Sequence, residues 1–296
     1  MKKLVLLFIF VCIVSGKAQE FYWTEINGQI PGNILTVSTD SSGFLFASNS
    51  QNKIFRSTDS GLNWQFLFNT SQAITKFSFA SQQEIFAVGG FYHIIYSSNN
   101  GDSWEIRNSG IKGFDEVLTI TKTQSGKLLA GAKTDCLSCD GGGIYTSTDN
   151  GINWVFVGLL NNYINSIIRG FGNKIFATAY DGVYLSTDDG NSWQLKNTGM
   201  QSYIKYLTID DNNILYAATE IYNELMFKSL DEGETWTQCN TGLPNDEVTG
   251  LISTDNKLYV LYKNAGVYCS SNSGITWNQI NNSLPNSLFN AISKML

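Results

Sequence analysis

The sequence contains little histidine, proline or charge for its length. Among 296 residues there are one histidine, His93, and 3 prolines, and charged residues make up 15% of the chain. A single histidine excludes a multi-histidine metal site and leaves a Ser-His or Cys-His pair with one candidate base. The low charge, combined with 13% aromatic residues and 27 glycines, favours an all-β protein over a helical one.

The first 19 residues have the pattern of a secretory signal peptide. Lys2 and Lys3 precede an apolar run over residues 4–14, and small and polar residues follow up to Gln19. The run is too short to span a bilayer comfortably, and no second apolar run of membrane length follows. We therefore expect residues 1–19 to be removed, residues 20–296 to form one domain, and the protein to be periplasmic or secreted without membrane insertion.

The charge of this mature chain bears on its partners. Without residues 1–19 the chain has 16 basic and 25 acidic residues, a net charge of −9. A surface of this sign repels nucleic acid and anionic lipid. We expect neither as a partner, and we expect a monomer.

One octapeptide, Ser-x-Asp/Asn-x-Gly-x-x-Trp, occurs six times. Its tryptophans are 40, 50, 39, 43 and 41 residues apart, and Trp23 lies 41 residues before the first, so every tryptophan belongs to one periodic series. The defining residues are Ser57, Asp59, Gly61 and Trp64; Ser97, Asn99, Gly101 and Trp104; Ser147, Asp149, Gly151 and Trp154; Ser186, Asp188, Gly190 and Trp193; Ser229, Asp231, Gly233 and Trp236; and Ser270, Asn272, Gly274 and Trp277.

Each copy has the features of a hairpin turn between two strands. The Asp or Asn side chain can accept backbone N–H bonds within the turn, and glycine can adopt a positive φ. Two further β-rich runs precede the hairpin in each unit, for example residues 74–79 and 84–88, or 203–209 and 213–218. Four short strands per 40 residues predict a blade of a β-propeller.

The octapeptide resembles the Asp-box, or BNR, repeat of sialidase-like propellers and of propellers similar to photosystem II assembly factors. The resemblance covers nearly the whole mature chain. It implies that the box is the turn between the third and fourth strands of a blade, on the face away from the ligand site. It therefore implies that the residues of all six boxes are structural.

Counting strands predicts six complete blades from about Ile34 to Ile280. A strand over residues 21–26 and another over residues 288–295 are left over, and we expect them to join as an incomplete seventh blade, because closing the ring removes exposed strand edges. A six-bladed ring with two free strands is the alternative.

The loops opposite the boxes are the expected ligand face. Aromatic rings beside carboxylates and amides suit the binding of sugar rings or extended peptides. The candidate residues are Phe91, Tyr92, His93, Phe114, Asp135, Asp140, Tyr180, Asp181, Tyr203, Glu220 and Tyr222. We expect an exported, non-catalytic propeller that binds a protein or a glycan there and needs no cofactor.

Two kinds of catalysis are suggested by the resemblance. Sialidase activity implies three converging arginines, but Arg56, Arg107 and Arg169 are all placed away from the candidate face. A glycoside hydrolase of the Asp-box propeller type needs only a pair of carboxylates, for which Asp181 and Glu220 are weak candidates. The hydrolase remains the alternative function, and the sialidase is disfavoured.

The long spacing before Trp154 comes from an insertion that contains Cys136 and Cys139. In a Gly-rich loop of an exported protein this pair predicts a local disulfide. A zinc site that adds His93 with Asp135 or Asp140 is the alternative, although we expect no metal. Cys239 and Cys269 are expected to be free buried thiols.

Overall fold

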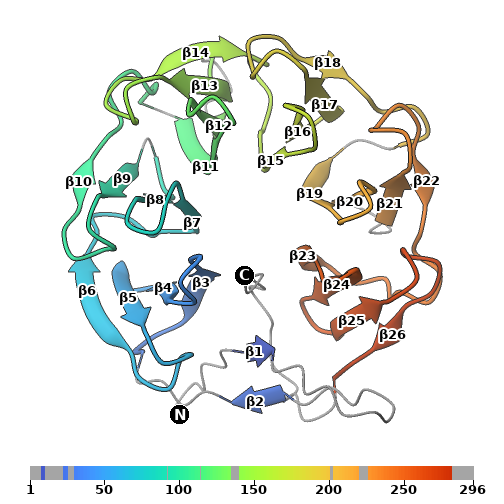
Figure 1. Ribbon diagram of the computed structural model, residues 1–296, viewed down its shortest axis with the longest axis horizontal. Coiled ribbons are helices and arrows are strands. Elements are labelled where there is room, and N and C mark those ends of the chain that lie inside the picture. Colours follow the sequence, from blue (N-terminus) through green and yellow to red (C-terminus); the bar gives the residue numbers. More distant parts are fainter. Residues whose placement is uncertain are drawn as a thin grey trace.

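The computed structural model describes residues 8–10, 23–25, 30–91, 93–113, 115–134, 140–200, 203–219 and 226–281. In this part of the chain all regular structure is β-strand, without a helix. Six four-stranded antiparallel sheets stand in a ring around a central axis, as Figure 1 shows. The predicted all-β propeller with six complete four-stranded blades is confirmed.

Within each blade the strands follow one another in chain order from the centre of the ring outward. Blade 1 contains β3 (Ile34–Thr39), β4 (Leu45–Asn49), β5 (Lys53–Ser57) and β6 (Gln65–Asn69). Blade 2 contains β7 (Lys76–Phe79), β8 (Ile85–Val88), β9 (Ile94–Ser97) and β10 (Glu105–Ile106). Blade 3 contains β11 (Asp115–Lys122), β12 (Leu128–Thr134), β13 (Gly143–Ser147) and β14 (Val155–Gly158).

The second half of the ring repeats this order. Blade 4 contains β15 (Ile167–Arg169), β16 (Ile175–Ala179), β17 (Gly182–Ser186) and β18 (Gln194–Leu195). Blade 5 contains β19 (Ile204–Ile209), β20 (Leu215–Thr219), β21 (Met226–Ser229) and β22 (Thr237–Gln238). Blade 6 contains β23 (Val248–Thr254), β24 (Lys257–Tyr262), β25 (Gly266–Ser270) and β26 (Asn278–Gln279).

A two-stranded sheet lies between the first and last blades (Figure 1). It pairs β1 (Phe8–Phe10) with β2 (Trp23–Glu25), and Phe10 stands opposite Trp23. β2 falls within the strand expected over residues 21–26, but its partner comes from the expected leader. The C-terminal strand expected over residues 288–295 lies outside the described residues.

The hydrophobic core lies between neighbouring blades. The second strands β4, β8, β16 and β20 are buried at every residue, because both of their faces are covered by adjacent sheets. One cluster joins Phe86 and Tyr96 of blade 2 to Val117 and Tyr145 of blade 3, and similar clusters fill the other junctions. Each blade is therefore stable only against its neighbours, as in other repeat proteins.

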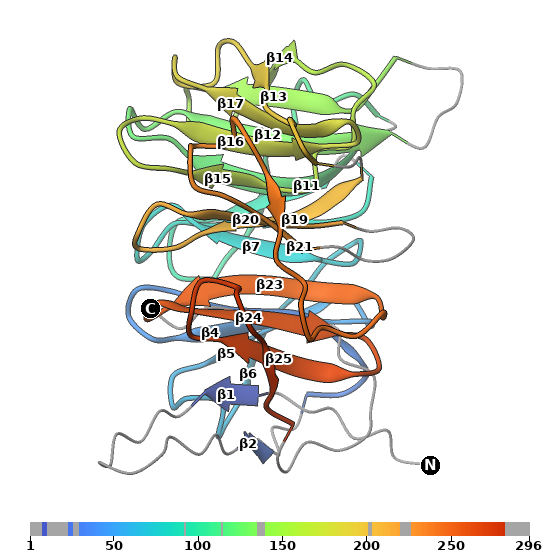
Figure 2. The same cartoon turned by 90° about the vertical axis from the view of Figure 1, so that its right-hand side faces the viewer.

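The alternating strand direction gives the ring two different faces, which Figure 2 shows edge-on at the two sides of the molecule. The octapeptide turns and the loops between first and second strands lie on one, which we call the turn face. The loops between second and third strands and the connections between blades lie on the other, which we call the loop face. No helix in the described residues could cross a membrane.

Candidate functional site

The six octapeptide turns share one hydrogen-bond pattern. In each, the serine hydroxyl donates to the Asp or Asn side chain and accepts from the glycine N–H, at 2.7–2.9 Å. The serines are 0–2% exposed. The glycine and the residue before it, the fourth of the octapeptide, both have φ between 55° and 88°. The hydroxyl is thus buried and satisfied, which is the pattern of a structural turn.

A cationic side chain of the preceding blade contacts the fourth residue of the turn at all five junctions from blade 1 to blade 6. The pairs are Arg56 with Asn100, Arg107 with Asn150, Lys127 with Asp189, Lys174 with Glu232 and Lys228 with Ser273. In three of these pairs the cation donates a hydrogen bond to the backbone carbonyl oxygen of the fourth residue, as Arg56 does to Asn100 at 2.7 Å and Lys228 does to Ser273 at 2.9 Å. The turns therefore hold neighbouring blades together.

Three of the repeated tryptophans also bond to the preceding blade. The indole N–H donates at 2.7–3.0 Å to the carbonyl three residues after the previous tryptophan, in the pairs Trp154 with Arg107, Trp236 with Lys196 and Trp277 with Cys239. The backbone N–H groups of Trp154 and Trp236 donate to Ser109 and Thr198 in the same way. Each of these rings thus buries apolar surface and supplies a directed contact.

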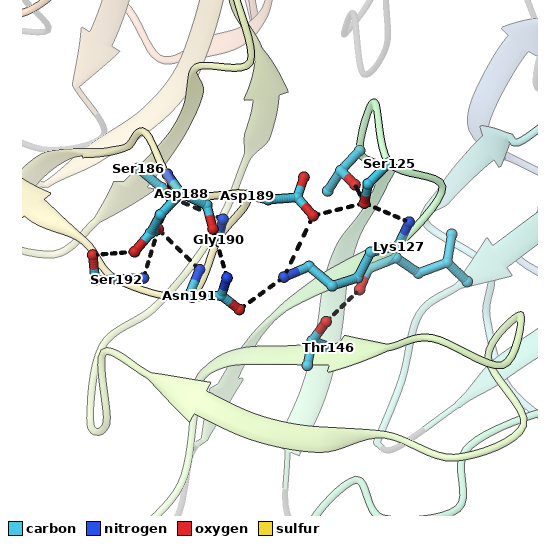
Figure 3. A network of polar contacts seen from close by, with 11 residues as sticks. Ser125, Lys127, Thr146, Ser186, Asp188, Asp189, Gly190, Asn191 and Ser192 are labelled. Carbon is cyan, nitrogen blue, oxygen red and sulfur yellow. Dashed lines mark hydrogen bonds and ion pairs between the residues drawn. The ribbon is translucent and has the colours of Figure 1, made fainter.

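Figure 3 shows the junction of blades 3 and 4. Ser125 donates to the Asp189 carboxylate at 2.7 Å, and the Lys127 amine donates to the Asn191 side chain at 3.0 Å. A hollow of about 340 Å³ lies beside them. Its other carboxylate, Asp188, is hydrogen-bonded within its own turn, and the Ser192 hydroxyl in particular lowers the pKa of Asp188 to about 2. The polar side chains around this hollow are therefore engaged in contacts within the turn and between the two blades.

Seven residues that were predicted for the ligand face or for the disulfide lie outside the described residues. These are Tyr92, Phe114, Asp135, Cys136, Cys139, Glu220 and Tyr222. The disulfide between Cys136 and Cys139 and the zinc alternative both involve these residues, so they stay predictions. Among the described residues no group of three or more His, Cys, Asp or Glu side chains could hold a metal ion. Cys239 and Cys269 are free and buried, and burial raises their pKa values to about 12 and about 11.

Two predicted aromatic residues, Tyr180 and Tyr203, form a pair on this face. Tyr180 follows β16, and Tyr203 directly precedes β19 in the next blade. Their ring centroids are 4.0 Å apart at an interplanar angle of 62°, their hydroxyl groups are hydrogen-bonded, and the Tyr203 N–H donates to the Tyr180 carbonyl at 2.7 Å. Tyr180 is nevertheless 45% exposed. The pair is held from the backbone, and the Tyr180 side chain remains partly exposed.

The connection from blade 3 to blade 4 also carries exposed apolar side chains. Leu160 is 41% and Tyr163 is 38% exposed. The Asn165 side-chain amide donates to the Ile204 carbonyl at 3.4 Å, which ties this connection to the residue after Tyr203. Sequence reasoning included Tyr203 but did not select Leu160, because an isolated leucine in a loop has no distinguishing pattern.

Phe91 and His93 occupy different environments. Phe91 is 47% exposed, and its backbone is held by the side chain of Gln72, whose Oε1 lies 2.8 Å from the Phe91 nitrogen. His93 lies in the loop between β8 and β9, which belongs to the loop face, but its side chain is only 5% exposed because it stands directly before the fully buried strand β9. Burial lowers the pKa of His93, and its Nε2 has no hydrogen-bond partner among the described residues.

The described carboxylates of the loop face are mostly engaged. Asp115 is buried and accepts from the Tyr145 hydroxyl at 2.5 Å, and Asp181 accepts from the Tyr184 hydroxyl at 2.7 Å. Burial and this bond raise the pKa of Tyr184 to about 12. The pKa of Asp246 is lowered: burial opposes the shift, but hydrogen bonds from Asn264 and the neighbouring backbone outweigh it. Asp140 is exposed.

These pKa directions bear on catalysis. A general acid in a glycosidase needs a carboxyl group whose pKa is raised. Wherever a carboxyl pKa in the described chain clearly departs from its ordinary value, it is lowered. Of the candidate pair, Asp181 is described and bonded to Tyr184, and Glu220 lies outside the described residues.

One further group escaped the sequence analysis. Lys76 begins the innermost strand β7, and its amine donates to the Thr119 hydroxyl of blade 3 at 2.9 Å. Burial lowers the pKa of Lys76 to about 8. A lysine at the start of a short strand gives no sign in the sequence that it points toward the next blade.

Comparisons with known proteins agree on the fold. Residues 157–257, about a third of the chain, match the DUF6242 beta propeller domain. A search of the curated proteins finds no match. Among solved structures, an ancestral GH74 enzyme has a TM-score of 0.71 and 19% identity over 87% of this chain, which spans 40% of the enzyme.

Two further solved structures are not described as enzymes. YCF48 bound to D1 peptide has a TM-score of 0.66 and 18% identity, covering 88% of this chain and 87% of YCF48. The extracellular domain of BT4673 from B. thetaiotaomicron has a TM-score of 0.66 and 19% identity, covering 87% of this chain and 34% of that one. The chain is thus a β-propeller protein whose fold is shared by enzymes and by a peptide-binding protein.

Proposed function

We propose that this chain is an exported, non-catalytic β-propeller of the Asp-box type that binds a protein or a glycan on its loop face. The observation that carries the proposal is the contrast between the two faces. At five junctions the turn face is occupied by contacts between blades, for example Arg56 with Asn100. The exposed aromatic side chains lie mainly on the loop face: Phe91, Tyr163 and Tyr180 are exposed there, whereas the exposed large apolar residues of the turn face are aliphatic except for Phe171. Exposed aromatic groups beside fixed polar groups are typical of binding sites.

A protein partner is the better supported of the two ligand classes. The fold of YCF48, whose structure contains the D1 peptide, covers 88% of this chain. The GH74 likeness supports a glycan, but the lowered pKa values of the described carboxyls do not favour hydrolysis. Export rests on the sequence of residues 1–19, and N-terminal sequencing of protein from the source cells tests it, with a first residue near position 20 as the expected result.

Site-directed photo-crosslinking in the source cells tests the binding face. A photo-crosslinking amino acid replaces Tyr163 on the loop face in one variant and Leu62 on the turn face in a matched variant; Leu62 is 70% exposed and Tyr163 is 38% exposed. We expect discrete adducts from the Tyr163 position only. Adducts from the Leu62 position alone would overturn the assignment of the face, and a glycan substrate shortened by the purified protein would overturn its non-catalytic nature.

A further inference from the structure

The two-stranded sheet of β1 and β2 lies where a seventh blade would stand. Figure 1 shows it between blade 6 and blade 1, with β1 closer to the centre of the ring than β2. Trp23, the first residue of β2, precedes Trp64 by 41 residues, and in each complete blade the outer strand begins directly after the repeated tryptophan. β2 therefore takes the place of an outer strand, and β1 takes the place next to it on the inner side.

The blades on both sides turn apolar, buried faces toward this sheet. On blade 1, Ala47 and Phe55 form a cluster with Ile30 that contains no described residue of another blade. On blade 6, the residues that alternate with those packed against blade 5 are 1–6% exposed; they are Tyr259, Leu261, Val267 and Cys269. Apolar faces of this kind are stable only when chain covers them, so this sector of the ring requires strands.

One of the two strands in this sector comes from the predicted leader. β1 pairs with β2 in an antiparallel register that sets Phe8 opposite Glu25 and Phe10 opposite Trp23, and within the described chain neither strand pairs with any other. Removing residues 1–19 takes β1 away, which leaves the backbone N–H and C=O groups on the inner edge of β2 without these partners. Unpaired groups at a strand edge are a template for the addition of another strand.

We propose that, in the processed chain, the inner edge of β2 binds an extended apolar segment of a partner protein in the place that β1 occupies. β1 itself shows the kind of segment that fits, because it is extended, antiparallel to β2 and made of Phe, Ile and Phe, residue types that favour strands. In such strand addition, backbone hydrogen bonds give the affinity and alternate side chains give the specificity. The site goes beyond the proposed function, since it lies between two blades rather than on the loop face; it shares with that function only the removal of residues 1–19.

Fluorescence anisotropy with a labelled peptide of residues 6–11, flanked by lysines for solubility, tests the site. We expect saturable binding to residues 20–296, and at least about tenfold weaker binding to the full chain, residues 1–296, whose own β1 competes intramolecularly for the edge. Ile9→Pro in the full chain interrupts β1 and should restore binding. Equal binding to the two chains overturns the inference. No binding to residues 20–296 also overturns it, in favour of the strand predicted over residues 288–295 as the occupant.

Backbone methylation of the peptide distinguishes strand addition from apolar adhesion. In an antiparallel pair the N–H groups of successive residues point alternately toward and away from the partner strand. Peptides methylated at the nitrogen of residue 9, or at the nitrogens of residues 8 and 10, should therefore differ in affinity by about tenfold or more. Equal affinities of the two methylated peptides would show that the peptide does not bind as a strand, and the inference would be wrong.

The register locates the site. A photo-crosslinking residue at position 10 of the peptide should form adducts around Trp23, and moving it to position 8 should shift the adducts toward Glu25. Adducts elsewhere, or a shift in the opposite direction, overturn the inference. Retention of residues 1–19 by the protein in its source cells overturns it as well, because β1 then stays in place. Adducts from Tyr163 on the loop face do not depend on any of these results, so this site and the proposed binding face can fail separately.

Discussion

The indole N–H of Trp236 donates a 3.0 Å hydrogen bond to the carbonyl of Lys196 across the boundary between blades 5 and 4. Trp236 is 3% exposed, so Trp236→Phe leaves this buried acceptor without its donor. Such a loss costs about 1–3 kcal/mol, to which the smaller ring adds a packing loss. We expect the free energy of unfolding in urea to fall by at least this amount.

Trp193 offers a matched control for this prediction. It occupies the same position in the octapeptide, but its indole N–H has no partner among the described residues. Trp193→Phe therefore changes packing without breaking a hydrogen bond, and we expect it to be less destabilising than Trp236→Phe. If both variants lost the same free energy of unfolding, the hydrogen bond to Lys196 would make no measurable contribution to stability.

Gly110 is expected to be the least replaceable glycine of a blade connection. It has a φ of 91°, and a Cβ there would lie 2.1 Å from the Trp154 carbonyl oxygen. Gly126 has a nearly identical φ of 93°, but a Cβ added there would meet no other atom within 4 Å. Gly126→Ala should cost only the conformational penalty of about 1–2 kcal/mol. Gly110→Ala should cost clearly more, as measured by thermal unfolding, and similar values for both would refute a packing role for Gly110.

The cationic contacts to the turns are expected to stabilise the junctions modestly. The Lys127 side chain is only 10% exposed and contacts Asp189 and Asn191. Lys127→Met keeps most of the volume, and we expect it to lower the free energy of unfolding by about 1 kcal/mol, since hydrogen bonds to charged groups are stronger than neutral ones. Lys263→Met removes a 43% exposed partner of Glu247 and should cost less than half as much. The prediction would be contradicted if Lys127→Met lowered the free energy of unfolding by no more than Lys263→Met does.

The sequence predicts the ring because its signals are local. Serine, glycine and tryptophan at fixed spacing define each hairpin, and the apolar runs define the strands, as for β7 and β8 within the predicted residues 74–79 and 84–88. The hydrogen bonds that the turns and tryptophans make with the preceding blade join residues 38 to 66 positions apart in the sequence. Nothing near Arg56 in the sequence shows that it will meet Asn100, which is why these contacts were not predicted.

The candidate site could be predicted only in outline. Aromatic residues in the loops opposite the turns were foreseen, including Tyr180 and Tyr203, but their contact requires the meeting of two neighbouring blades. The left-handed backbone of Tyr203 has no signal in the residue type, since tyrosine normally avoids it. The burial of the His93 side chain was not foreseen, because it depends on the strand that follows it, which is buried at every residue.

The turn aspartates predict how stability depends on pH. The backbone and side chain of Asn153, with the Ser147 hydroxyl, lower the pKa of Asp149 to about 2, and those of Asp59 and Asp231 are also lowered. In the unfolded chain the pKa of an aspartate is about 3.9. Because the unfolded state binds protons first, their stabilisation is complete above about pH 4 and is lost as the pH falls toward about 2. We expect the melting temperature to drop over this range.

A double substitution can isolate one of these turns. Two natural turns have Asn in place of Asp, and there the seventh residue of the octapeptide carries a hydroxyl, as in the 2.9 Å bond from the Asn99 amide to Ser103. Asp149 instead accepts from the amide of Asn153 at 2.8 Å. Combining Asp149→Asn with Asn153→Ser copies the Asn99 turn without a titrating group. At pH 7 the melting temperature of this variant should be slightly below that of the unmodified chain. In acid the unmodified chain loses the contribution of Asp149, so the two melting temperatures should converge or change order. An unchanged acid slope would show that Asp149 does not contribute to it.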